Sequence, residues 1–134
     1  MYPRVVVRLD HLRENVKVVR ELCEKNHISI TGVTKVFRGD PKIAQCYLDG
    51  GLTMLGDSRT ENLERMQALS AEKWLIRPPM LSRAAETARY ADAALHSEWK
   101  VIEAVAAEAE KLGKKHKVIL MADLGDIREG YVDY

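Results

Sequence analysis

Short runs of apolar residues alternate along the chain with longer stretches in which apolar residues recur every three or four positions. The short runs predict strands and the longer stretches predict helices. The strands are expected at residues 28–35, 52–57, 73–77, 91–97 and 117–123. This alternation, with a period of roughly 20 to 25 residues, is typical of βα units in a parallel α/β sheet with right-handed crossovers. Because the runs are apolar throughout, we expect both faces of the sheet to be covered.

Polar and small residues mark where the helices begin and end. Asp10 is expected to cap a helix that runs to about residue 26, after a short extended segment from Tyr2 to Leu9. Asp40 is expected to cap the next helix, with Pro41 at its first position and Gly50 after its end. Further helices are expected after Ser58, from Ser82 to Tyr90 and from Glu98 to Leu112.

The composition indicates one globular unit, residues 1–134. The chain is 46% hydrophobic and 31% charged, which suffices for one core and not for two. Its net charge of +1 and few aromatic residues give no reason to expect a nucleic-acid partner. Cys23 and Cys46 are too sparse for a disulfide framework and are expected to be reduced thiols. Without a membrane-spanning run or a signal peptide, a cytoplasmic protein with no membrane partner is expected.

A lysine near the end of the first predicted strand is the centre of the candidate chemistry. Lys35 follows the β-branched run that begins at Ile28, and the chain then turns at Gly39. Burying an unpaired ammonium group is costly, so an inward-pointing Lys35 is expected to be neutralised, paired or covalently used. A buried lysine loses its proton readily, as Schiff-base chemistry requires.

Other polar residues also collect where the predicted strands end. They are Asp57, Ser58, Arg59, Arg77, His96, Ser97, Asp123 and Arg128. Ligands of parallel α/β folds bind at the carboxyl edge of the sheet, so this set predicts a small-molecule site. The alternative is that each strand end becomes polar only because it reaches solvent. No metal site is expected, because the acidic loop after Asp123 lacks the calcium-loop spacing and the histidines lack ligand spacing.

Four motifs in a fixed order resemble the alanine racemase N-terminal-domain superfamily. They are Asp10 to Asn15, Gly32-Val33-Thr34-Lys35, Gly56-Asp57-Ser58-Arg59-Thr60-Glu61-Asn62 and Asp123-Leu124-Gly125-Asp126-Ile127-Arg128-Glu129-Gly130. Members are fold-type III pyridoxal-phosphate enzymes on a (β/α)₈ barrel, and the resemblance is greatest to the alanine/ornithine racemase branch. It implies a partial TIM barrel of about the first five βα units, and thus an N-terminal fragment.

The resemblance also implies roles for individual residues. Lys35 would form the internal aldimine with pyridoxal 5′-phosphate and would exchange the Cα proton of the substrate. Arg128 matches an arginine close to the cofactor and substrate. Four further residues are expected to bind the cofactor from their strand-end position alone: Asp57, Ser58, His96 and Ser97.

Two departures from the family pattern favour the ornithine-type branch over an alanine racemase proper. Phe37, Arg38 and Gly39 stand where the family has a tyrosine that helps to hold the cofactor phosphate. Met121 stands where family members often have a lysine.

The implied function is that of a pyridoxal-phosphate-dependent racemase, with ornithine or another basic amino acid as substrate. A complete barrel needs about 250 residues, so the fragment alone is expected to be inactive. Because its strand edges are exposed, it is expected to be marginally stable, to self-associate, or to have a mobile last strand and tail. The full-length protein is expected to be a homodimer. Two alternatives stay open: a non-catalytic pyridoxal-phosphate carrier of the same barrel superfamily, and a flavodoxin-like regulatory domain with five parallel strands.

Overall fold

A computed structural model describes residues 2–125 and 129–131 of the 134-residue chain. Its strands are β1 (Gly32–Val33), β2 (Met54–Asp57), β3 (Glu72–Leu75), β4 (Ala93–His96) and β5 (Lys117–Leu120). Its helices are α1 (Leu9–Glu24), α2 (Pro41–Asp49), α3 (Thr60–Arg65), α4 (Ala84–Tyr90) and α5 (Trp99–Lys111). Two 3₁₀ turns lie at Lys35–Phe37 and Leu81–Arg83.

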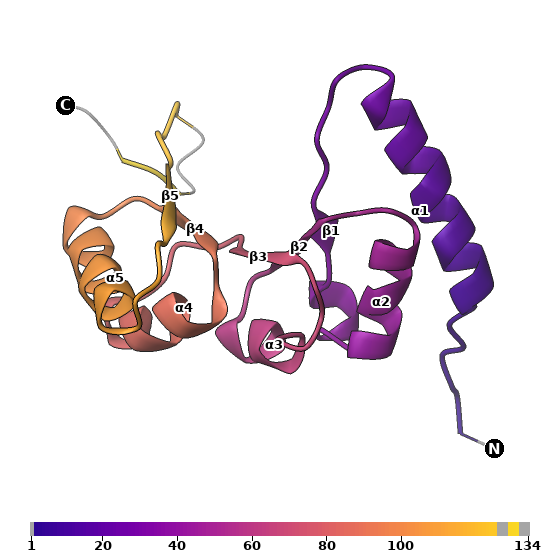
Figure 1. The fold of residues 1–134 in the computed structure, drawn as a ribbon, viewed down its shortest axis with the longest axis horizontal. Coiled ribbons are helices and arrows are strands. Elements are labelled where there is room, and N and C mark those ends of the chain that lie inside the picture. Colours follow the sequence, from indigo (N-terminus) through magenta and orange to yellow (C-terminus); the bar gives the residue numbers. More distant parts are fainter. Residues whose placement is uncertain (1, 126–128, 132–134) are drawn as a thin grey trace.

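The strands form one parallel sheet in which each strand pairs with its neighbours in the sequence, in the order β1-β2-β3-β4-β5. A flavodoxin-like sheet has the order 2-1-3-4-5, so that alternative is wrong. Consecutive order is that of a (β/α)₈ barrel. Figure 1 shows the strands as a curved row with α2, α3, α4 and α5 along its outer side, so the described chain is a partial barrel.

The main core lies between the sheet and the helices on its outer side. Leu55, Leu75 and Ala94 project from β2, β3 and β4, and they pack with Leu63 and Met66 at the end of α3. All five side chains are buried. The regular spacing of apolar residues along the strands therefore places one apolar row against the helices.

The opposite face of the sheet is open in the described part of the chain. Side chains alternate along a strand, so Met54 and Trp74 point away from this core, and both are only partly buried. Leu95 of β4 and Ile119 of β5 pair with each other on this same face, and they too are only partly buried. The expectation that both faces are covered is therefore wrong for the described residues, because a row of five strands does not close into a barrel.

The first strand is shorter than the predicted range 28–35. Thr34 ends it, because the Thr34 carbonyl accepts hydrogen bonds from the amides of Phe37 and Gly39, both at 3.2 Å. The chain therefore turns directly after β1, and Lys35 begins the 3₁₀ turn instead of ending a strand. The other strands are also shorter than predicted, and the last ends at Leu120 instead of residue 123.

The ends of the helices agree with the prediction at α2 and differ at α1. Asp40 caps α2, its side chain accepts from the amides of Lys42 and Ile43, and Pro41 is the first helical residue. Asp10 is not the cap, because α1 begins at Leu9 and has Arg8 at its N-cap, two residues earlier than predicted. The segment from Tyr2 to Arg8 is exposed and belongs to no strand. A 3₁₀ turn precedes α4, which starts at Ala84 instead of Ser82.

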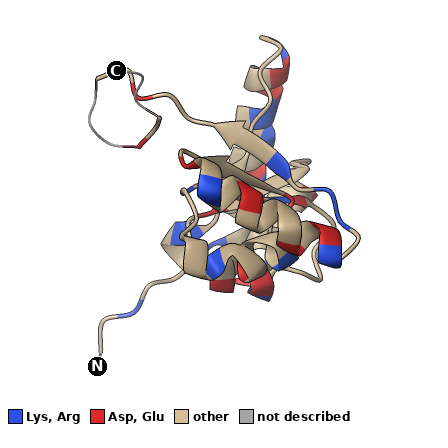
Figure 2. Ribbon diagram, turned by 90° about the vertical axis from the view of Figure 1, so that its left-hand side faces the viewer, with Lys and Arg blue, Asp and Glu red and all other residues tan. Residues whose placement is uncertain are grey.

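Charge is balanced over the molecule. The chain has 21 Lys and Arg against 20 Asp and Glu, and Figure 2 shows the two signs interspersed along the helices. Both cysteines are free, as predicted. Among the described residues, none of the helices has the length and apolar character needed to cross a bilayer.

Candidate functional site

Lys35 lies at the carboxyl edge of the sheet, where β1 gives way to the 3₁₀ turn. Its side chain is exposed and borders a hollow of about 850 Å³. Ser58 and Arg59, which follow β2, line the same hollow. The structure therefore brings together the predicted lysine and one of the predicted cofactor-binding residues, Ser58. The inward, buried placement considered for Lys35 is not observed, because the opposite face of the sheet is open.

Asp57 lies next to this hollow but is fully buried. Its Oδ2 atom accepts a hydrogen bond from Thr34 Oγ1 at 2.7 Å. Its Oδ1 atom accepts from the Arg59 amide at 3.1 Å and from Asn62 Nδ2 at 2.9 Å. Both oxygens are thus engaged by protein groups, and the carboxylate links the end of β1 to the start of α3.

The turn after Lys35 is docked on α3 at a glycine. Gly39 has φ +63°, and a Cβ atom there would lie 2.7 Å from the carbonyl oxygen of Asn62. Only glycine combines this left-handed conformation with so close an approach. Arg38 also has a positive φ of 56°, and its carbonyl accepts from Arg65 Nη1 at 2.9 Å. The Lys35 turn is therefore held to α3 by backbone and side-chain contacts.

The hollow beside Lys35 has an excess of positive charge. Lys35, Arg38 and Arg59 line it, against one acid, Glu61. An adjoining hollow of about 410 Å³ is also bordered by Arg59 and contains Arg77 from the end of β3. Cations that converge in this way suit a phosphate or carboxylate group.

The structure does not bring His96 and Ser97 to the Lys35 hollow. They line a separate cavity of about 10 Å³ with Pro78 and Pro79. His96 is buried, its Nε2 lies 3.4 Å from His116 Nε2, and its Nδ1 has no hydrogen-bond partner among the described residues. Burial, with a smaller contribution from His116, lowers the pKa of His96 to about 4, so the ring is neutral at pH 7.

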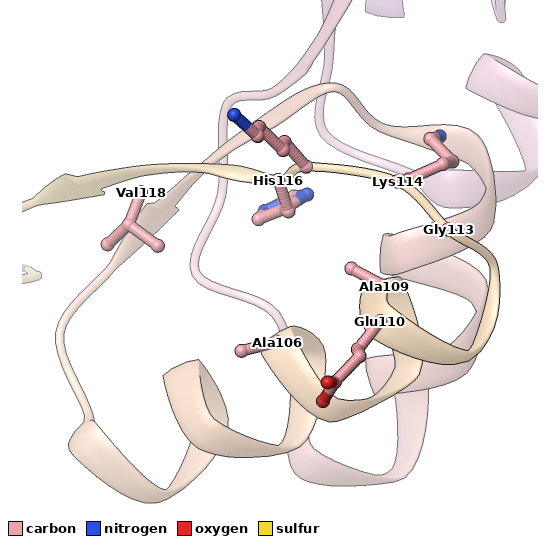
Figure 3. A pocket seen from close by; sticks show the side chains of 8 residues that line it. Ala106, Ala109, Glu110, Gly113, Lys114, His116 and Val118 are labelled. Carbon is pink, nitrogen blue, oxygen red and sulfur yellow. The ribbon is translucent and has the colours of Figure 1, made fainter.

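His116 borders a further hollow, of about 510 Å³, at the opposite end of the sheet from Lys35. Figure 3 shows this hollow between α5 and β5, with Ala106 and Val118 on its walls. Burial is the main cause that lowers the pKa of His116, while the hydrogen bond that His116 Nδ1 donates to the Ala91 carbonyl acts in the opposite direction. The two histidines therefore belong to the packing between helices and sheet.

Arg128 lies outside the described residues, so its predicted place near the cofactor is not tested. Two residues of the Lys35 neighbourhood carried no predicted role, namely Thr34 and Asn62. The register of β1 and β2 brings Thr34 to Asp57: Val33 pairs with Gly56, so the next residues, Thr34 and Asp57, lie side by side. Strand register cannot be read from one sequence.

Comparison with known proteins identifies the family. Residues 7–134 match the family described as alanine racemase, N-terminal domain. The chain belongs to this family. Family membership agrees with the consecutive order of the parallel strands.

Two curated relatives of this alanine racemase family domain are racemases of basic amino acids. Ornithine racemase of Acetoanaerobium sticklandii is 35% identical over 133 residues, which is 99% of this chain and 38% of the relative. Lysine racemase of Thermotoga maritima is 36% identical over 132 residues, which is 97% of this chain and 37% of the relative. The chain thus spans less than two fifths of the length of these relatives.

A solved structure with the same fold is PipY of Synechococcus elongatus PCC7942 with PLP bound. The TM-score is 0.77 at 16% sequence identity, and the match covers 90% of this chain and 58% of PipY. At this identity the likeness shows the fold, a parallel α/β sheet of the barrel type.

Proposed function

We propose that this chain is the lysine-bearing part of a pyridoxal-phosphate-dependent amino-acid racemase. The observation that supports it most is the accessible amine of Lys35 at the carboxyl edge of the sheet, in a hollow shared with Ser58 and Arg59. Parallel barrels bind substrates at this edge. The 35–36% identity to ornithine and lysine racemases supports a basic amino acid as the substrate.

The residues around Lys35 fit pyridoxal phosphate. When bound, the cofactor supplies an aldehyde that condenses with an amine and a ring that delocalises negative charge. Lys35 offers the primary amine, and Arg38 and Arg59 supply positive charge for anionic groups in the same hollow. Ser58 adds a hydroxyl group that can donate or accept a hydrogen bond. The proposal keeps Arg128 as a cofactor-binding residue. It leaves out direct contacts of Asp57, His96 and Ser97 with the cofactor, because both Asp57 oxygens accept from protein donors and the other two residues line a separate cavity.

In the proposed racemase, Lys35 moves the proton at the substrate Cα. Its Nζ accepts a proton only in the neutral form, so the reaction requires the amine to be deprotonated when the substrate is in place. Racemisation needs a second acid/base group on the opposite side of Cα, and we assign it to the part of a longer protein that this chain does not span. We also propose that the longer protein is a homodimer and that it lies in the cytoplasm. The cytoplasm is a reducing compartment, which fits the two free thiols.

Trapping with borohydride tests the role of Lys35. The chain is incubated with pyridoxal phosphate and reduced, and the labelled peptides are identified by mass spectrometry. Lys35 is expected to carry most of the label, and Lys42 and Lys100, which are also exposed, little. The Lys35→Ala variant is expected to lose this label, and Lys42→Ala to keep it. Equal labelling of Lys35, Lys42 and Lys100 would contradict an organised cofactor site.

A non-catalytic pyridoxal-phosphate carrier is the second candidate, because PipY shares the fold and its solved structure has PLP bound. Both candidates place the cofactor on Lys35, so trapping does not separate them. The decisive measurement is the loss of optical rotation of L-ornithine and L-lysine in the presence of the longer protein. A racemase abolishes the rotation and its Lys35→Ala variant does not, whereas a carrier leaves the rotation constant.

A further inference from the structure

We infer that Asp57 and Thr34 are positioning residues for the Lys35 amine. They act through the backbone turn that carries the lysine, and they do not touch the substrate. This inference rests on the proposed function, since it concerns the same lysine. It assigns Asp57 a task other than direct contact with the cofactor.

Thr34, which is itself fully buried, hydrogen-bonds both to the sheet and to the turn. Its amide donates to the Gly56 carbonyl at 2.9 Å and thus belongs to the sheet. Its carbonyl accepts from the amides of Phe37 and Gly39 and thus belongs to the turn. Thr34 is therefore the residue at which the sheet fixes the direction of the chain before Lys35.

Asp57 also has an environment that fits a positioning role. It is a fully buried carboxylate with no salt bridge among the described residues, and neutral donors from Thr34, Arg59 and Asn62 surround it. Burying such a charge is costly unless donors are held in place. The contact of Thr34 Oγ1 with Oδ2 is the shortest of the three at 2.7 Å, as expected for a hydroxyl donor and a charged acceptor.

The same cluster of Thr34, Asp57 and Asn62 also holds the far end of the turn. Asn62 donates to Asp57 through its side chain, and its backbone carbonyl lies against Gly39. The turn from Lys35 to Gly39 is thus held at its first residue through Thr34 and at its last residue through Asn62. Asp57 binds both anchors, so one buried carboxylate sets the place of Lys35 relative to α3.

The test compares Thr34→Val, which removes the hydroxyl at nearly constant volume, with Thr34→Ser, which keeps it. Thr87→Val is the matched control, because Thr87 is also fully buried and its hydroxyl has no hydrogen-bond partner among the described residues. Two quantities are measured on the whole 134-residue chain. They are amide hydrogen exchange at Phe37 and Gly39, and the ratio of borohydride-trapped pyridoxal phosphate on Lys35 to that on Lys42.

In Thr34→Val, exchange at Phe37 and Gly39 is expected to accelerate roughly tenfold, and the labelling ratio to fall by a similar factor, because a buried acceptor loses its donor. Core amides such as that of Leu63 are expected to stay protected. Thr34→Ser and Thr87→Val are expected to behave as the unmodified chain. A role in stability alone would change exchange in the core and leave the labelling ratio as it was.

Unchanged exchange at Phe37 and Gly39 in a folded Thr34→Val chain would overturn the inference. If Thr34→Val does not fold, Asp57→Asn decides, because its amide group would face other donors and is expected to release the same turn. Wild-type exchange at Phe37 and Gly39 in Asp57→Asn would then overturn it. If the unmodified chain shows no preference for Lys35, the proposed function fails, while the exchange data still decide what holds the turn.

Discussion

At the scale of single residues, the contact between His96 and His116 has consequences for stability. Their Nε2 atoms lie 3.4 Å apart, and the rings meet edge to face with centroids 5.6 Å apart. The positive charge of Lys114 also lowers the pKa of His116, whereas the negative charge of Asp92 raises it. Both imidazoles have lowered pKa values because of burial, so each resists the uptake of a proton in the folded chain.

The chain is therefore expected to lose stability as the pH falls from about 6.5, the ordinary pKa of histidine, toward the pKa of His96, about 4. In that window the unfolded chain binds protons that the folded chain does not, so the free energy of unfolding falls with falling pH. For His96 alone the loss is on the order of 3 kcal/mol. Urea unfolding at a series of pH values measures it.

The matched variants for this prediction are His96→Gln and His11→Gln. His96→Gln removes the buried titrating ring and is expected to flatten the dependence on pH. His11 is exposed on α1, so its replacement is expected to leave the dependence unchanged. A pH profile of His96→Gln equal to that of the unmodified chain would assign the acid sensitivity to other groups.

The sequence was informative about which residues lie at the strand ends and uninformative about where they point. Lys35, Asp57 and His96 were all predicted at strand ends from apolar runs. Asp57 and His96 end β2 and β4, whereas Lys35 begins the 3₁₀ turn two residues after β1 ends. Yet Lys35 is exposed, while Asp57 and His96 are buried on the side of the helices. The side of the sheet that a strand-end residue faces depends on register and on the exact end of the strand, which a single sequence leaves undetermined.

At the scale of elements, the connection between β1 and α2 depends on Gly39. Its φ of +63° is nearly equal to the φ of +62° at Gly113, which follows α5. The two glycines differ in their surroundings. A Cβ atom at Gly39 would meet the backbone of Asn62, whereas a Cβ atom at Gly113 would meet nothing within 4 Å.

Gly39→Ala is therefore expected to destabilise the chain more than Gly113→Ala. Both variants carry the cost of a left-handed alanine, about 1 kcal/mol. Gly39→Ala adds the displacement of packed backbone, roughly 1 to 3 kcal/mol more. Chemical denaturation of the two variants measures the difference directly. Equal losses would mean that the turn moves away from α3 without cost.

The helix ends show why some element boundaries could be predicted. Asp40 followed by Pro41 is a strong start signal, because the carboxylate accepts amide hydrogen bonds and proline needs no amide partner at the first position. Asp10 was ambiguous, since an acid within the first turn also stabilises a helix through its dipole. In α1, Asp10 lies within the first turn, and its Oδ2 is 3.5 Å from Arg8 Nη2.

At the scale of the whole molecule, the exposed face and edge of β5 are expected to drive self-association. In the described part of the chain β5 pairs only with β4, and Leu120 is 64% exposed. An apolar strand with unpaired backbone groups is a template for another chain. Sedimentation velocity across a concentration series is therefore expected to show species larger than a monomer for this chain.

Leu120→Lys is expected to shift these species toward the monomer. Val6→Lys serves as the control, because Val6 is equally exposed, at 65%, but lies outside the sheet. If the two variants sediment alike, the association does not use β5.

The consecutive order of the strands has a consequence for how the chain is made. In the described part of the chain, each strand from β2 to β5 pairs with the one synthesised just before it. Contacts of this local kind favour fast folding, and domains begin to fold from the amino terminus during synthesis. As the chain is synthesised, one strand at a time can thus add to the growing sheet, whose two edges are β1 and the newest strand.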